Sequence, residues 1–204
     1  MRNIKRATIA LFLILLTSCA VSNATIKAYS DPSLTKGSIS KLAVFPVRNA
    51  RLAPSEANQI NRKISSSIKN QSPNIKIMSS TEAIRKINDK NLADDWAKFL
   101  DDYTSSGIPN VKVLQRIGKQ IGVDSIMQGE LVNVVQQDGQ YTRNVGMTRV
   151  TVRFSILDTK TGKLLWEASS DGVRQTASTV EPAPPLVEAI NLAIDKILQN
   201  LPAI

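Results

Sequence analysis

The pattern of apolar and polar positions along the chain predicts five strands and five helices. In each predicted strand, apolar residues alternate with polar ones or run continuously over a short stretch. The predicted strands are Lys41–Arg48, Asn74–Ser80, Ser125–Val135, Met147–Leu157 and Leu164–Ser169. Pro46 lies near the end of the first strand, and because proline donates no ladder hydrogen bond it predicts a sheet edge or a bulge there.

The helices are indicated by apolar residues that recur every three or four positions. Four apolar stripes are Ala57, Ile60, Ile64 and Ile68; Leu92, Trp96, Phe99, Leu100 and Tyr103; Leu114, Ile117 and Ile121; and Leu186, Ile190, Ile194, Ile197 and Leu201. The fifth helix is predicted by a capping box, in which Ser79 precedes Glu82 by three residues. Gly122 is suited to end the helix that contains Ile121. The order of elements predicts one α/β domain, a mixed sheet of about five strands flanked by helices.

The aromatic stripe has two interpretations. Trp96, Phe99 and Tyr103 fit a helix packed on the core, and they also fit a partly exposed surface for a partner or ligand. Helical periodicity is the same in both cases, so the sequence leaves the choice between core and interface open.

The first eighteen residues have the plan of a secretory signal peptide. Arg2, Lys5 and Arg6 precede an apolar run at Ala7–Leu16, which is ten residues long. A membrane-spanning helix needs about 20 apolar residues, so this run is too short to cross a bilayer. Residues 1–18 are therefore predicted to be removed.

The only cysteine of the chain follows directly. The sequence Leu16-Thr17-Ser18-Cys19 resembles a bacterial lipobox, the recognition site of lipoprotein signal peptidase. The resemblance implies cleavage before Cys19, a diacylglycerol on its sulfur and acylation, for example with palmitate, of its new amino group. The alternative is an ordinary signal peptide with a chance cysteine. Ala20, in place of aspartate, resembles the sorting pattern of enterobacterial lipoproteins of the outer membrane.

The residues after the cysteine predict a tether. Residues 20–40 are rich in Ser, Thr and Ala and lack sustained periodicity. We therefore predict three segments: a signal peptide at 1–18, a lipidated cysteine with a flexible tether at 19–40, and an α/β domain of periplasmic type at 41–201.

Composition limits the possible chemistry. The chain has no histidine, which excludes Ser-His-Asp and Cys-His catalysis and most zinc sites, and one cysteine permits no internal disulfide. We predict no cofactor and no metal. Three of its 26 basic residues precede the cleavage site, so the mature chain keeps 23 basic against 17 acidic residues, about +6. This charge suits acidic polymers, lipid headgroups or acidic proteins, or it is ordinary solvated charge. The basic residues form no long run, so nucleic acid is not a predicted partner.

Three longer segments carry a family resemblance. "SKLAVFPVRN", "LQRIGKQIGVDSIMQGEL" and "VRFSILDTKTGKLLWEASSDG" are similar to the lipoprotein superfamily of curli-secretion-channel subunits and penicillin-binding-protein activators. The resemblance implies a fold like that of anticodon-binding domains and brings no catalytic residues. Residues 136–145 are too few to hold the extra membrane-spanning hairpins of a channel subunit, and the tether is short for an activator that crosses peptidoglycan.

Together these features favour a non-enzymatic adaptor or assembly factor, lipid-anchored in the cell envelope, with an envelope protein as partner. The alternative is a surface-exposed lipoprotein that binds a ligand or host factor. A periplasmic hydrolase would need a carboxylate pair. The candidate carboxylates are Asp94, Asp95, Asp101, Asp102, Asp124 and Glu130. Partner identity, orientation and oligomeric state are left open by the sequence.

Overall fold

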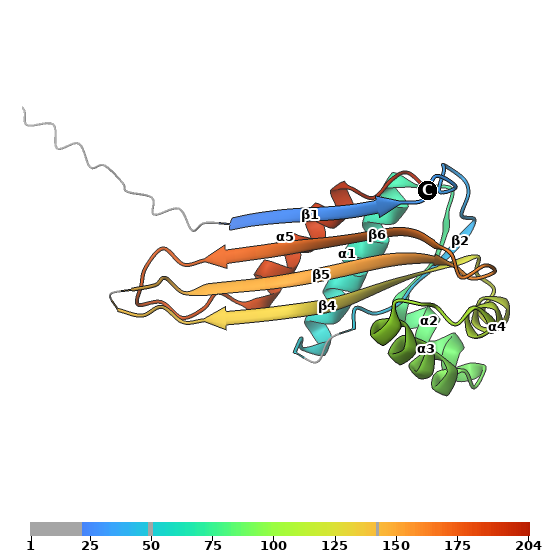
Figure 1. Cartoon of the computed structure of the whole chain (residues 1–204), viewed down its shortest axis with the longest axis horizontal. Coiled ribbons are helices and arrows are strands. Elements are labelled where there is room, and N and C mark those ends of the chain that lie inside the picture. The colour runs from blue at the N-terminus through green and yellow to red at the C-terminus, as the bar shows by residue number, and fades with distance from the viewer. Residues whose placement is uncertain (1–21, 49–50, 142) are drawn as a thin grey trace, which may run out of the picture.

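The computed structural model describes residues 22–48, 51–141 and 143–204. Within these residues, six strands form one mixed sheet that is flanked by five helices (Figure 1). The elements are β1 (Ser22–Ser30), β2 (Lys41–Val44), α1 (Pro54–Gln71), β3 (Lys76–Met78), α2 (Ser80–Asp89), α3 (Ala93–Ser106), α4 (Val111–Ile121), β4 (Ser125–Gln137), β5 (Met147–Asp158), β6 (Leu164–Gln175) and α5 (Leu186–Gln199). The predicted fold class is confirmed, with one strand more than the five predicted.

The sheet has the strand order β1-β6-β5-β4-β2-β3. In this order, β1, β6, β5 and β4 pair antiparallel with their neighbours, whereas β2 pairs parallel with both β3 and β4. The β5–β6 hairpin turns at the predicted place, because Asp158 Oδ1 accepts hydrogen bonds from the backbone N of Lys160 (2.9 Å) and of Thr161 (2.7 Å). Gly162 has a φ of 70°, a left-handed conformation that glycine adopts without strain.

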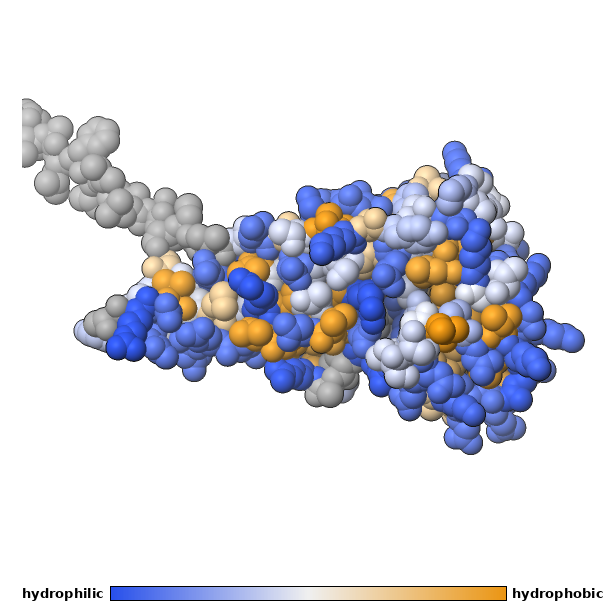
Figure 2. All heavy atoms as spheres, in the orientation of Figure 1, coloured by the Kyte–Doolittle hydropathy of each residue, from blue (hydrophilic) through white to orange (hydrophobic). Residues whose placement is uncertain are grey.

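Helices cover the two faces of the sheet unequally. Helices α1 and α5 cover one face along its length, while α2, α3 and α4 cover the other face only at one end, over β2, β3 and the adjoining ends of β4 and β5 (Figure 1). Alternate residues of β2 and of the position after it divide between the two cores: Leu42 and Val44 join the α1/α5 side, and Ala43 and Phe45 join the other. The rest of the second face, across β1, β6, β5 and β4, is the open face. Hydrophobic side chains appear there as small separate groups among hydrophilic ones (Figure 2).

The tether prediction is wrong for the residues that the structure describes. Ser22–Ser30 forms β1, which pairs with β6 along its whole length, from Ser22 opposite Arg174 to Ser30 opposite Trp166. The strand lies at the edge of the sheet and is largely exposed, so its sequence is mostly polar. Ile26 packs on the α1/α5 core, and the backbone ladder to β6 supplies the remaining contacts.

The first predicted strand is not at an edge. β2 lies between β3 and β4, and it ends at Val44, before Pro46. Phe45 N and Arg48 N donate to carbonyl groups of β4, each over 2.8 Å, and Val47 N donates to Asn61 Oδ1 over 3.3 Å. Pro46 therefore occupies a position after the strand where no amide donor is required.

The aromatic stripe lies in the core. Trp96 and Phe99 are buried between α3, α4 and the sheet, and Tyr103 is partly buried beside them. The rings stack in a row that begins at Phe45, with centroid distances of 3.8 Å to Trp96, 5.5 Å from Trp96 to Phe99 and 5.7 Å from Phe99 to Tyr103. The core interpretation is therefore correct.

The caps at Ser79 and Gly122 are confirmed, the first as one half of the predicted capping box. Ser79 Oγ accepts a hydrogen bond from Glu82 N at the start of α2, and Gly122, in the left-handed conformation, ends α4. Among the described residues, none of the helices has the length and apolar character that crossing a bilayer requires.

Candidate functional site

The predicted lipidation site lies outside the described residues. These are Leu16, Thr17, Ser18 and Cys19, and the description begins at Ser22, three residues after the cysteine. Ser22 is opposite Arg174, near the end of β6. The chain therefore enters the sheet at the end that carries the β4–β5 loop and the loop after β6.

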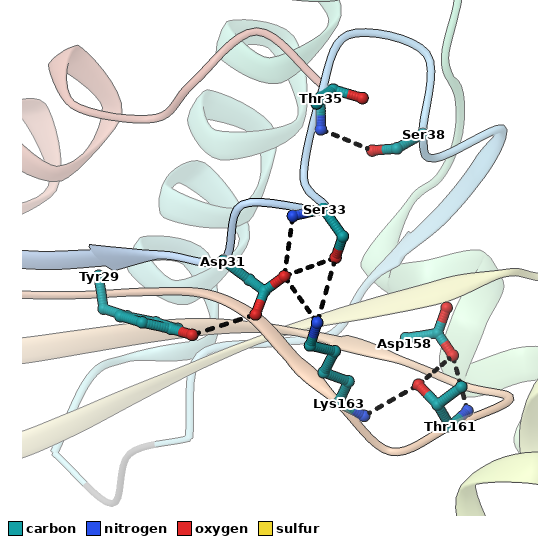
Figure 3. A network of polar contacts seen from close by, with 8 residues as sticks. All are labelled: Tyr29, Asp31, Ser33, Thr35, Ser38, Asp158, Thr161 and Lys163. Carbon is teal, nitrogen blue, oxygen red and sulfur yellow. Dashed lines mark hydrogen bonds and ion pairs between the residues drawn. The ribbon is translucent and has the colours of Figure 1, made fainter.

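At its other end, β1 is fixed by a polar network around Asp31 (Figure 3). Lys163 Nζ donates to Asp31 Oδ1 over 2.8 Å, and Ser33 donates to the same oxygen from its backbone N (2.9 Å) and its Oγ (2.6 Å). Tyr29 Oη donates to Oδ2 over 3.2 Å, and Asp31 N donates to Leu165 O over 2.8 Å. The hydrogen bonds from Lys163 and Ser33 hold the pKa of Asp31 well below its usual range, and the carboxylate raises the pKa of Lys163.

Six lysines gather at the end of the molecule opposite Ser22. We call this region the lysine end; its lysines are Lys36, Lys41, Lys76, Lys86, Lys119 and Lys160, of which Lys86 is half-buried and the others are exposed. Lys41 and Lys76 are the first residues of β2 and β3 and are partners in the parallel register. Lys119 lies in the last turn of α4, and Lys160 lies in the β5–β6 turn. Parallel pairing thus places side by side lysines that are far apart in the sequence.

The lysine end is hollowed on several sides of Lys41. One cavity of about 420 Å³ is lined by Lys36, Lys41 and Lys76 together with residues 71–75 and Ile204. A second, of about 510 Å³, is lined by Lys41, Lys119 and Lys160 with Asp124. A smaller third, of about 180 Å³, brings in Lys86 and Glu82.

Two acidic residues line these cavities, and both already bind other groups. Asp124 Oδ2 accepts hydrogen bonds from the backbone N of Ser40 (3.1 Å) and of Lys41 (3.0 Å), and Glu82 lies 3.7 Å from Lys86 Nζ. Among the residues described, the other five lysines of this end form no ion pair within 4.0 Å. The arrangement leaves a local excess of positive charge that suits an anionic partner.

Four of the six carboxylates considered for hydrolysis, Asp95, Asp101, Asp124 and Glu130, already bind other groups. Asp95 pairs with Arg116, and Asp101 pairs with Arg48 at 3.2 Å. Glu130 accepts from Arg153 at 2.7 Å on the open face, which raises the pKa of Arg153. Glu130 is six residues along the chain from Asp124, about 20 Å in an extended strand, so the structure does not bring this pair together. Within the described ranges, no group of three or more histidine, cysteine, aspartate or glutamate residues is placed to hold a metal ion.

Comparisons with known proteins give low similarities. No protein-family model matches the chain, and no curated protein matches it. Among solved structures, a PelC dodecamer from Paraburkholderia phytofirmans is 16% identical with a TM-score of 0.47, over 89% of this chain and 100% of that chain. A second PelC dodecamer structure from the same organism is 17% identical with a TM-score of 0.44, over 86% of this chain and 95% of that chain. Lipoprotein GNA1162 from Neisseria meningitidis is 11% identical with a TM-score of 0.44, over 79% of this chain and 99% of that chain.

Proposed function

We propose that this protein is a lipid-anchored lipoprotein of the cell envelope that acts as a non-enzymatic adaptor and holds an acidic envelope protein at its lysine end. One observation carries the proposal: a strand that begins three residues after Cys19 leads directly to the opposite end of the sheet. Nine residues of β1 cover about 26 Å. A lipid on Cys19 would place the membrane at one end of the domain and turn the lysines away from it.

The partner's chemistry follows from the lysines. Apart from Lys86, which pairs with Glu82, they are exposed point charges on flexible stems, which attract acidic groups without demanding one fixed geometry. Three shallow cavities that share Lys41 suit several carboxylates of an acidic protein surface better than one enclosed small molecule. The superfamily resemblance in the sequence supports the same class of function, an assembly factor without catalysis.

The anchor is tested by Cys19→Ala in cells grown with labelled palmitate. The wild-type chain should incorporate the label and sediment with membranes, in the outer-membrane fraction if the Ala20 pattern sorts it there. Two or three acyl chains anchor stably where one does not, so Cys19→Ala should lose both the label and the membrane association. Label that persists in Cys19→Ala would refute lipidation at this residue.

The partner site is tested by crosslinking in cells followed by mass spectrometry of the captured protein. The triple variant Lys41→Glu, Lys76→Glu and Lys119→Glu should lose most of the capture. A matched control, Lys90→Glu, Lys98→Glu and Lys112→Glu, changes the net charge equally at exposed lysines outside the three cavities. Equal loss in both variants would indicate that overall charge, and not the lysine end, recruits the partner.

A further inference from the structure

Two loops form a joined tip at the end of the sheet where β1 begins. We define the tip by the described residues of the β4–β5 loop (138–141 and 143–146) and by residues 176–185 after β6. Gly139 N donates to Glu181 O over 2.9 Å, and Ala183 N donates to Asp138 Oδ1 over 2.8 Å. Thr176 N donates to Gly146 O over 2.9 Å. These bonds hold the two loops together as one surface.

The tip exposes apolar side chains. Tyr141 is 83% exposed and Val180 is 60% exposed, and Val135, at the neighbouring end of β4, is 41% exposed. The charged residues of the tip are Asp138, Arg143 and Glu181, with no lysine among its described residues. Tyrosine and tryptophan are enriched at the headgroup region of membranes, so an exposed tyrosine beside an exposed valine, on a surface of little net charge, suits contact with that region.

The position of β1 relates the tip to the predicted lipid. Ser22 is in register with Arg174 of β6, which pairs with Thr148 of β5, which in turn pairs with Gln136 of β4. The tip loops continue from this row at the same end of the sheet, and the lysine end lies opposite (Figure 1). Three residues reach at most about 11 Å, so Cys19 cannot lie far from this end.

We propose that the tip rests on the lipid bilayer that holds Cys19, with the side chains of Tyr141 and Val180 in the headgroup region. The proposal rests on lipidation of Cys19, and it adds a second, non-covalent contact to the anchor. One attachment point would leave the domain free to rotate about the linker. Contact through the tip fixes its orientation and directs the lysine end away from the membrane.

The test uses the full lipidated protein in vesicles of phosphatidylethanolamine and phosphatidylglycerol with brominated acyl chains, which quench tryptophan emission at close range. Tyr141→Trp and Val180→Trp place a reporter on the tip. Ile108→Trp is the matched control, because Ile108 is an exposed apolar residue, 71% exposed, in the loop between α3 and α4. The native Trp96 and Trp166 are buried and give the same background in every variant.

Both tip reporters should lose emission in brominated vesicles relative to unbrominated ones, while the Ile108→Trp reporter keeps its emission. If the protein floats with the vesicles and neither tip reporter is quenched beyond the control, the tip contact is wrong and the lipid anchor stands. If the wild-type chain does not float, the anchor fails and the tip contact fails with it. Two reporters protect the test against one substitution that disturbs its loop.

Discussion

The tip and the lysine end are built in opposite ways. The tip is held by backbone hydrogen bonds between two loops and exposes an aromatic and an aliphatic side chain with few charges. The lysine end is formed by the starts of two parallel strands, a helix end and a turn, and it carries six lysines, five of them exposed. The difference agrees with the two proposed contacts, in which the tip contacts a membrane and the lysine end contacts an acidic partner. The length of the sheet sets the distance between these two contacts.

The largest effect should come from breaking the structure that joins the two ends. Gly172 in β6 lies directly against the backbone of α5, where a Cβ atom would collide with Ala189 O and approach Ala193 N to 3.0 Å. Gly172→Val must displace the helix, so we expect a loss of about 3 kcal/mol or more in the free energy of unfolding, measured by urea titration. Ser169→Val, on the open side of the same strand, is the control and should change stability by about 0.5 kcal/mol or less. A stable Gly172→Val protein would contradict the close packing of α5.

Raising the salt concentration should weaken the contact made by the lysine end and leave the membrane contact unchanged. Raising the ionic strength from about 0.1 M to 1 M shortens the Debye length from about 10 Å to 3 Å, which screens exposed lysines. We expect capture of the acidic partner at the lysine end to fall by about tenfold, equivalent to about 1.4 kcal/mol. Vesicle flotation depends on acyl chains and apolar contact, so it should remain unchanged. Flotation that falls in parallel with capture would show that the membrane contact is also electrostatic.

A smaller, local effect is expected at the Asp31 network. Asp31→Asn removes the charge that Lys163 contacts, so amide hydrogens at the end of β1 should exchange faster at pH 7, as measured by mass spectrometry. The pKa of Asp31 is lowered in the folded state, so its contribution is present at pH values above about 4, the ordinary aspartate range, and is lost as the pH falls. The difference between variant and wild type should therefore shrink toward pH 3. A difference that grows on acidification would contradict a lowered pKa.

The smallest effect is expected between the two ends. The Arg153–Glu130 pair lies on the open face and is partly exposed, so Arg153→Met should cost less than about 1 kcal/mol of unfolding free energy. Urea titration measures this, and crosslinking and flotation should both match wild type. Loss of either activity would place a third functional surface on the open face.

Much of the fold could be predicted from local patterns. Alternation in β5 and the apolar stripes of α1, α4 and α5 arise from burial on one face, and the caps at Ser79 and Gly122 depend only on nearby residues. β1 was missed because an edge strand needs little apolar sequence. Ile26 alone packs on the core, and the ladder to β6 is made by backbone atoms that leave no trace in side-chain periodicity.

The candidate sites differ in the same way. The lipobox at Leu16–Cys19 is contiguous, so the sequence alone predicts it, and its lipidation stays a prediction. The lysine end was missed because Lys41, Lys76 and Lys119 are separated by more than thirty residues each and meet only through parallel pairing and the packing of α4. The tip was missed because the exposure of Tyr141 and Val180 depends on how two separate loops join.

The register of β1 has a mechanical consequence. If Cys19 is held in a membrane and a partner pulls on the lysine end, the force acts along the axis of β1, away from the anchor. In this geometry the antiparallel ladder to β6 is loaded in shear, so the nine residue pairs from Ser22 to Ser30 resist together instead of opening one after another. The Asp31–Lys163 contact at the far end of the strand adds a final restraint against sliding. A strand that buries little surface can thus transmit force between a membrane and the partner that the domain holds.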